Sequence, residues 1–171
     1  MDWLLILLRI IHIFSGVVWV GGAAYVYFYI EPTLNKLGPA SEPFVDEIIN
    51  KKKMSVFFMI AATLTVLGGV LVYWKDTGLV LDTMAQPTYL AFGLGGLCAI
   101  VAWLMGGAAL GPAVKRVGQL AAEMKAAGGP PSADLLARMH AAQERVRLIG
   151  GIDLVLVALA LLGMATARYL A

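Results

Sequence analysis

Arg9-Ile-Ile-His-Ile-Phe-Ser-Gly-Val-Val-Trp-Val-Gly-Gly22 is the stretch that decides the fold, because it lies inside an apolar run from Trp3 to Ile30. About 20 apolar residues suffice for a helix to cross the hydrocarbon core of a bilayer. Arg9 and His12 are the only strongly polar side chains in the run. The stretch therefore predicts a membrane-spanning helix that carries two ionisable groups.

The composition of the whole chain agrees with this reading. Of the 171 residues, 60% are hydrophobic and 14% are charged, whereas soluble domains carry about 25% charged residues. Lipid requires each spanning segment to satisfy its own backbone groups, which favours helices. We predict an all-α polytopic membrane protein, one integral membrane domain over 1–171, with four transmembrane helices in an up-down bundle. The predicted spans are 3–30, 54–74, 88–110 and 148–170.

The placement of Lys and Arg predicts the orientation. The second connection holds only Lys75, and the two ends add only Arg168 beyond Arg9. Positively charged connections remain on the cytoplasmic side. We therefore expect the first and third connections in the cytoplasm and both termini outside. These two connections hold Lys36, Lys51, Lys52, Lys53, Lys115, Arg116, Lys125, Arg138, Arg145 and Arg147.

The third connection, 111–147, is long and patterned. Apolar residues recur at helical spacing on both sides of Gly128-Gly129-Pro130-Pro131, a sequence that breaks a helix. Ser132 is placed to cap a second helix that runs into the fourth span. We predict two amphipathic helices against the cytoplasmic face, and we interpret their charged residues as a solvated basic face.

The sequence also hints at an internal duplication. Trp19-Val-Gly-Gly-Ala-Ala24 is echoed by Trp103-Leu-Met-Gly-Gly-Ala-Ala109, and a proline follows each copy, Pro32 and Pro112. This pattern suggests tandem helix pairs related by an axis along the membrane normal.

One face of the first span carries the candidate site. Residues three and four apart share a helix face, which groups Arg9, His12, Gly16 and Trp19. A neutral imidazole near mid-bilayer can ligate heme iron. Gly16 would leave room for a flat macrocycle and Trp19 would wall its far edge. Arg9 would pair with the heme propionates. The alternative is a packing histidine bonded to a backbone carbonyl, with Arg9 directed to lipid phosphate or Asp2.

A second axial ligand is not obvious. His140 is the only other histidine and lies in the cytoplasmic connection, away from His12. Cys98 and Met164 lie at a suitable depth, but such residues more often simply pack. Five-coordinate heme, or a ligand from a second subunit, stays open.

Asp153 is a carboxylate inside the fourth span. An ionisable group at such a depth suggests a proton path or an ion pair. Of these we favour the pair, with Arg147 or Lys53 as the partner.

The residues of Leu7-Leu-Arg-Ile-Ile-His-Ile-Phe-Ser-Gly-Val-Val-Trp-Val-Gly-Gly22 resemble the first helix of a superfamily of bacterial membrane proteins. The superfamily includes HemJ-type protoporphyrinogen oxidases, copper-resistance D-like (CopD-like) proteins and the membrane domain of cytochrome-c-linked urate oxidases. Its shared pattern is an early His, a small residue, Trp and Gly. The resemblance is greatest to four-helix relatives of the CopD-like group, and it implies heme b on His12. The third span lacks the lysine of the HemJ type, so the resemblance implies no specific reaction.

These observations, with the resemblance, predict a protein of the bacterial cytoplasmic (inner) membrane with a heme b site. It would act in electron transfer or in oxidation of a small membrane-accessible substrate. The alternatives are a non-enzymatic transporter of copper or another small solute, and a structural subunit of a larger membrane complex. The expected partners are the lipid bilayer and a redox partner or a second copy of the chain. No feature predicts nucleic-acid binding.

Overall fold

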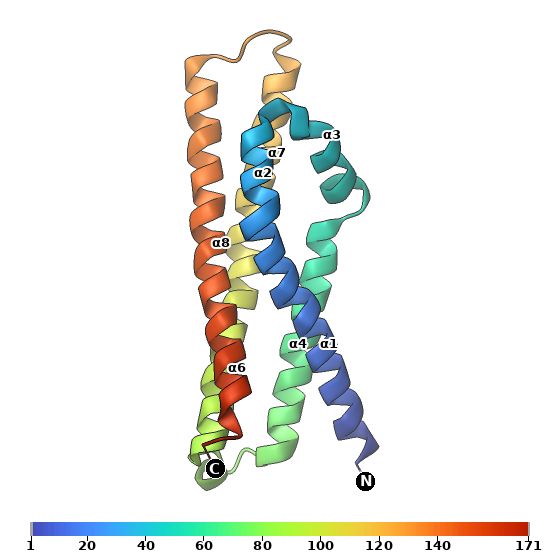
Figure 1. Ribbon diagram of the computed structural model, residues 1–171, viewed down its shortest axis with the longest axis vertical. Coiled ribbons are helices and arrows are strands. Elements are labelled where there is room, and N and C mark those ends of the chain that lie inside the picture. Colours follow the sequence, from blue (N-terminus) through green and yellow to red (C-terminus); the bar gives the residue numbers. More distant parts are fainter. Residues whose placement is uncertain (1, 171) are drawn as a thin grey trace.

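The computed structural model describes residues 2–170, and within this range every regular element is a helix or helical turn (Figure 1). Long helices alternate with shorter helices and turns along the chain. In chain order the elements are α1 (Trp3–Tyr25), η1 (Val26–Ile30), α2 (Glu31–Leu37), η2 (Gly38–Ser41), α3 (Glu42–Val45), η3 (Asp46–Lys51), α4 (Met54–Thr77), α5 (Leu81–Met84), α6 (Pro87–Met105), η4 (Gly106–Leu110), α7 (Gly111–Ala126) and α8 (Ala133–Ala167).

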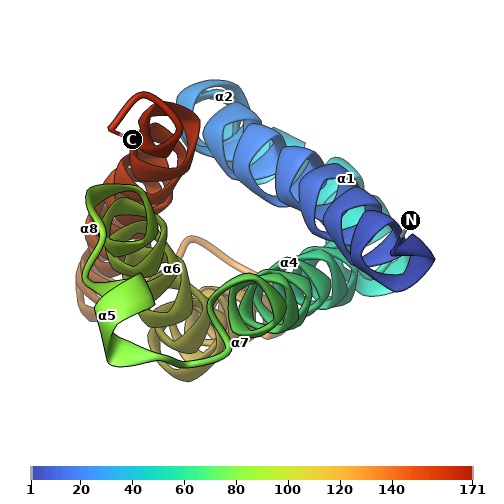
Figure 2. The ribbon, with the colours of Figure 1, turned by 90° about the horizontal axis from the view of Figure 1, so that it is seen from below.

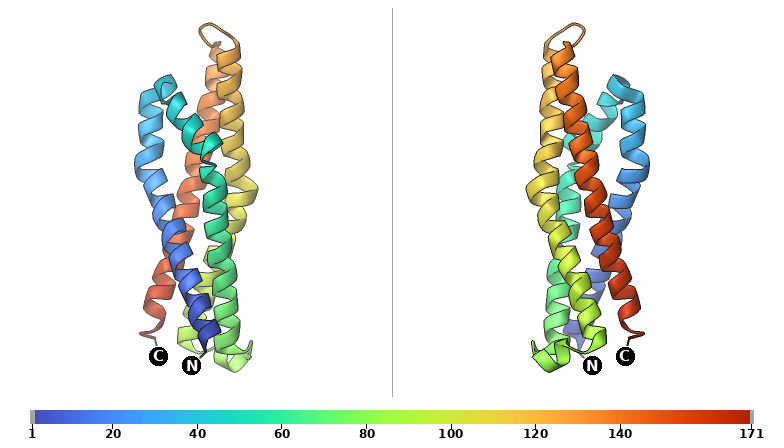
Figure 3. Two further views of the ribbon diagram at one scale, coloured as in Figure 1. Left: turned by 90° about the vertical axis from the view of Figure 1, so that its right-hand side faces the viewer. Right: turned by 90° about the vertical axis from the view of Figure 1, so that its left-hand side faces the viewer.

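Four helices are long and apolar enough to cross a membrane, which confirms the number of predicted spans. The first, third and fourth are longer than the apolar segments that revealed them. Helix continues without interruption from Trp3 to Leu37 and from Pro87 to Ala126, and α8 begins at Ala133. Helix α7 and the first part of α8 therefore prolong the bundle along its axis and do not lie across its end (Figures 1 and 3).

Local sequence signals explain where two of these helices begin. Asp2 caps α1, since its Oδ1 accepts a hydrogen bond from the Leu5 backbone N–H at 3.0 Å. Ser132 caps α8 in the same way through the Leu135 N–H, at 3.2 Å. The predicted break at 128–131 and the predicted continuity of the second connecting helix with the fourth span are both confirmed.

A π turn interrupts two of the long helices. It is η1 in the helix Trp3–Leu37 and η4 in the helix Pro87–Ala126. In each turn an N–H bonds to the carbonyl five residues earlier, from Glu31 to Val26 and from Gly111 to Gly106. Pro32 and Pro112 follow directly. Proline lacks an N–H and crowds the carbonyl four residues before it, so a wider turn relieves the strain. A π turn therefore precedes each of the two prolines.

The helices pack as two pairs. Helix α1 packs mainly on α4 and α6 mainly on α8, while contact between α4 and α6 joins the pairs. Figure 2 shows this arrangement along the bundle axis, with the start of α1, the end of α8 and the short α5 at the same end. The shared core consists mostly of small side chains, which allow close helix approach. Its buried members are Trp19, Ala61, Ala62, Val66, Ala99, Ala102, Val157 and Ala160.

Candidate functional site

The imidazole of His12 lies in the contact between α1 and α4. Its Nδ1 is 2.7 Å from the backbone carbonyl oxygen of Thr65. A carbonyl can only accept a hydrogen bond, so Nδ1 carries the proton and donates it. In the neutral ring, Nε2 is then a bare acceptor. Nε2 has no hydrogen-bond partner among residues 2–170, and it is not one of the polar atoms sealed inside the protein.

Two consecutive glycines of α4 make room for this ring. A Cβ on Gly69 would lie 2.8 Å from His12 Cε1 and 3.0 Å from Nδ1. A Cβ on Gly68 would lie 3.3 Å from His12 Cβ and 3.4 Å from its Cα. The imidazole therefore rests directly on the α4 backbone. Its position depends on the missing side chain at Gly69, a residue that the stripe on α1 alone could not reveal.

The hydroxyl groups beside His12 are satisfied without its imidazole, since Ser15 Oγ reaches only the backbone carbonyl of His12, at 3.3 Å. Ser15 Oγ donates to the Ile11 carbonyl at 2.5 Å. Thr65 Oγ1 lies 2.8 Å from the Ala61 carbonyl and 3.0 Å from Ser15 Oγ. Both side chains thus form hydrogen bonds with helix backbones and with one another. His12 Nε2 is left as the polar atom of this cluster without a hydrogen bond within residues 2–170.

Arg9 has a protein partner. Its Nη2 lies 2.8 Å from Asp76 Oδ2 near the end of α4. Asp2 pairs instead with Lys75, whose Nζ lies 2.6 Å from Asp2 Oδ2. These crossed ion pairs fasten the start of α1 to the end of α4. Neither the propionate nor the lipid partner expected for Arg9 is needed to account for its position.

Gly16 and Trp19 face protein in this structure. A Cβ on Gly16 would lie 3.5 Å from Thr65 Cγ2, so the space beside Gly16 is taken up by α4. Trp19 is buried in the core shared by the two helix pairs. Among the four residues of the predicted stripe, His12 is the one with a ligand atom to spare.

The residues considered as a second axial ligand lie elsewhere. Met164 contacts Gly95 in the contact between α6 and α8, with its Cγ 3.5 Å from a Cβ built there. Cys98 packs against the core from α6. His140 is exposed in the first part of α8. Within residues 2–170, no three His, Cys, Asp or Glu side chains gather as a metal-binding group.

Asp153 does not form the ion pair favoured by the sequence. The side chain is buried in α8, with only 6% of the residue exposed. Neither Arg147 nor Lys53 pairs with it, and Oδ1 is sealed from solvent with no hydrogen-bond donor among residues 2–170. The preferred ion pair is therefore not formed. A buried carboxylate without a partner is costly, so its presence calls for a role.

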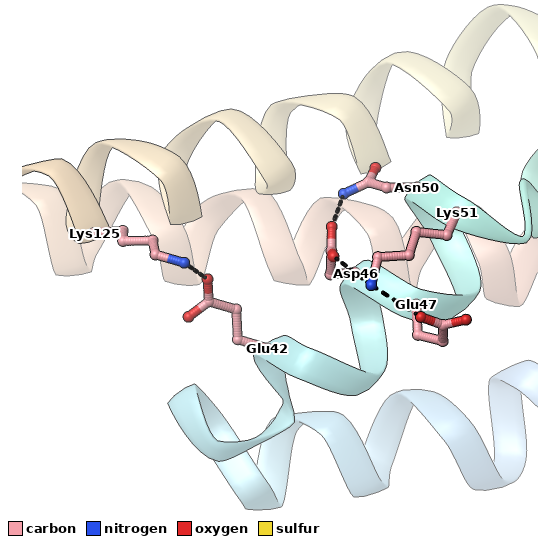
Figure 4. Close-up of polar contacts among 6 residues, drawn as sticks. All are labelled: Glu42, Asp46, Glu47, Asn50, Lys51 and Lys125. Atoms are coloured by element: carbon pink, nitrogen blue, oxygen red, sulfur yellow. Dashed lines mark hydrogen bonds and ion pairs between the residues drawn. The ribbon is translucent and has the colours of Figure 1, made fainter.

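Ion pairs of the connections form a separate group (Figure 4). Lys125 of α7 lies 2.6 Å from Glu42 of α3, which ties the first connection to the third. Lys51 bonds to Glu47 at 3.1 Å, and Asn50 donates to Asp46 at 2.9 Å. These side chains are largely exposed, and they hold the connections together at a distance from His12.

Comparison of the chain with protein-family models, with curated proteins and with solved structures gives no match. The features of the molecule that bear on its function are the imidazole of His12 and the carboxylate of Asp153, both in candidate membrane spans.

Proposed function

We propose that the chain is a membrane-spanning heme protein in which His12 ligates the iron of a b-type heme through Nε2. Its role would be to transfer electrons or to oxidise a small membrane-accessible substrate. The observation that carries this proposal is the 2.7 Å hydrogen bond from His12 Nδ1 to the Thr65 carbonyl. Histidine ligands of metals commonly donate their second N–H to a carbonyl, which fixes the ring and leaves the other nitrogen free.

The support for this proposal comes from one residue, His12. The Thr65 carbonyl orients the imidazole, and the missing side chain at Gly69 makes room for the ring. The ion pair between Arg9 and Asp76 holds the helix that carries His12. Because Gly16 and Trp19 are taken up by helix packing, the proposal rests on His12. When bound, the heme would supply one-electron chemistry that amino-acid side chains lack.

A visible spectrum tests the proposal. The full-length chain, produced in cells supplied with a heme precursor and purified in detergent, should show a Soret band and dithionite-sensitive α and β bands. His12→Ala should lose these bands. His140→Ala is the matched control, since it removes the other histidine from an exposed position. A colourless wild-type protein, or equal bands in His12→Ala, would refute heme ligation by His12. Co-purification of a colourless protein with other chains would favour a structural subunit.

We further propose that the spans cross the bacterial inner membrane up and down, with both termini outside. The start of α1, the end of α8 and α5 lie at one end of the bundle, and the Lys-rich connections lie toward the other (Figure 1). This arrangement is consistent with the positive-inside rule. Cysteines introduced at Asp2 and Ser132 should react with an impermeant thiol reagent from opposite sides of the membrane.

The orphaned carboxylate favours a second candidate function, proton-coupled transport of a small solute. Carboxylates buried in membrane helices recur in proton relays, and Asp153 Oδ1 lacks any partner among residues 2–170. Proteoliposomes with an entrapped pH dye should acidify faster with wild-type protein than with Asp153→Asn, which preserves the shape of the side chain. Equal proton flux in the two samples would exclude this function for Asp153.

A further inference from the structure

A groove lies between η1 and α8, on the side of the fourth span away from Asp153. Its volume is about 600 Å³ and it is open along one side. Binding sites for small molecules typically have volumes of about 300–1,000 Å³. Leu148, Ile152 and Val155 form the apolar wall, and Glu144 and Arg147 stand at one end. The groove is distinct from the site at His12, and no step in the proposed function uses it.

The groove owes its shape to two glycines of α8. Tyr27 of η1 lies across Gly150 and Gly151, and a Cβ on Gly151 would lie 3.0 Å from the tyrosine Oη. The tyrosine ring can therefore approach the α8 backbone and form a wall. The π turn at η1, required by Pro32, sets the position of Tyr27.

The long wall of the groove has the chemistry of a site for acyl chains. Leu148, Ile152 and Val155 are spaced four and three residues apart, so they form one stripe on α8. All three side chains are exposed, at 66%, 48% and 58%. In a membrane-spanning helix such a stripe faces lipid tails.

The end of the groove carries charges of both signs. Glu144 and Arg147 are three residues apart and lie on the same face of α8, and neither has an ion-pair partner among residues 2–170. Glu31 of α2 is close enough to Arg147 for their charges to interact. Two carboxylates beside one guanidinium disfavour a purely anionic headgroup. They suit a headgroup that carries a phosphate and a protonated amine.

We propose that this groove binds phosphatidylethanolamine. The lipid phosphate accepts hydrogen bonds from the Arg147 guanidinium, and the ammonium group donates to Glu144. One acyl chain follows the stripe from Leu148 to Val155. Phosphatidylcholine carries a quaternary ammonium without N–H, so it can meet only the first of these requirements.

Native mass spectrometry of the full-length chain in detergent tests the proposal, with three lipids that have identical acyl chains. Phosphatidylethanolamine should bind about tenfold more tightly than phosphatidylcholine, because a hydrogen bond to a charged group is lost with choline. Arg147→Gln and Glu144→Gln should each weaken its binding by about tenfold. Arg145→Gln is the matched control, since it removes a neighbouring exposed charge outside the groove.

Three results would overturn the proposal. Equal binding of ethanolamine and choline lipids would show that no amine is recognised. Tighter binding of phosphatidylglycerol would show selection for a net negative headgroup. An equal loss of binding in Arg145→Gln would show a general effect of surface charge. Thermal unfolding of each variant in detergent should match that of the wild type, because all the substituted side chains are exposed.

Discussion

Adding a single methyl group at Gly69 should loosen the contact between α1 and α4. In Gly69→Ala the new Cβ would lie 2.8 Å from His12 Cε1 and 3.0 Å from Nδ1. Both distances are too short for non-bonded atoms, so the ring must move or the helices must separate. The matched control is Gly96→Ala in α6, where a Cβ would meet no atom of residues 2–170 within 4 Å.

The expected size of the effect follows from these two responses. If the imidazole swings away, it loses the 2.7 Å hydrogen bond to Thr65, worth about 0.5–1.5 kcal/mol. If the imidazole stays, overpacking costs about 1–3 kcal/mol. Both substitutions gain the same helix propensity, about 1 kcal/mol, which cancels in the comparison. The cheaper response sets the cost, so Gly69→Ala should be about 0.5–1.5 kcal/mol less stable than Gly96→Ala.

Thermal unfolding in detergent, followed by circular dichroism, measures this difference. The chemical shifts of the His12 ring nitrogens report in parallel whether Nδ1 keeps its hydrogen bond. If Gly69→Ala is as stable as Gly96→Ala and the nitrogen shifts are unchanged, His12 does not rest on the α4 backbone, and the argument for an oriented Nε2 fails with it.

Three further predictions concern the polar contacts that hold the helices together. The hydrogen bond from Lys75 keeps the pKa of Asp2 below its ordinary value. This contact therefore stabilises the fold at neutral pH and is lost as pH falls through the lowered pKa. An NMR titration should show the pKa of Asp2 rising in Lys75→Gln, and an unchanged pKa would disprove the pair. Arg9→Gln and Asp76→Asn should each cost about 0.2–1 kcal/mol, since the two side chains are 53% and 26% exposed, and a double-mutant cycle with strictly additive effects would argue against their coupling. Trp103→Phe removes the 3.0 Å hydrogen bond from Trp103 Nε1 to Thr63 Oγ1 and should cost about 0.5–1.5 kcal/mol of stability. Thr63→Val removes the same hydrogen bond. In chemical unfolding, the double variant should therefore lose less stability than the two single variants added together.

The spans and the starts of the helices could be predicted from sequence because their causes are local. Twenty apolar residues need lipid wherever they occur, and Ser132 caps α8 through a backbone N–H only three residues away. The third membrane-spanning helix, Pro87–Ala126, is longer than the predicted span 88–110. The helix continues past Pro112 to Ala126, because the wider π turn η4 just before the proline relieves its strain.

The candidate site was only partly predictable, because its partners are distant in sequence. Arg9 and Asp76 are separated by 67 residues, and no local pattern joins them. The stripe on α1 identified one face of a helix but not the helix that covers it, so Gly16 was assigned to open space that Thr65 occupies. Gly68-Gly69 in an apolar span was the available signal for close helix approach.

The π turns η1 and η4 affect which residues can be substituted during evolution. Each turn adds one residue to a helix of about 3.6 residues per turn, which rotates everything beyond it by about 100°. The helix faces of α2 and α7 are therefore rotated relative to the faces of α1 and α6, which precede them. Exposed residues of α2 and α7 can be substituted to alter the surface at that end, whereas Ala113 and Leu120 of α7 are buried where α7 packs on α8.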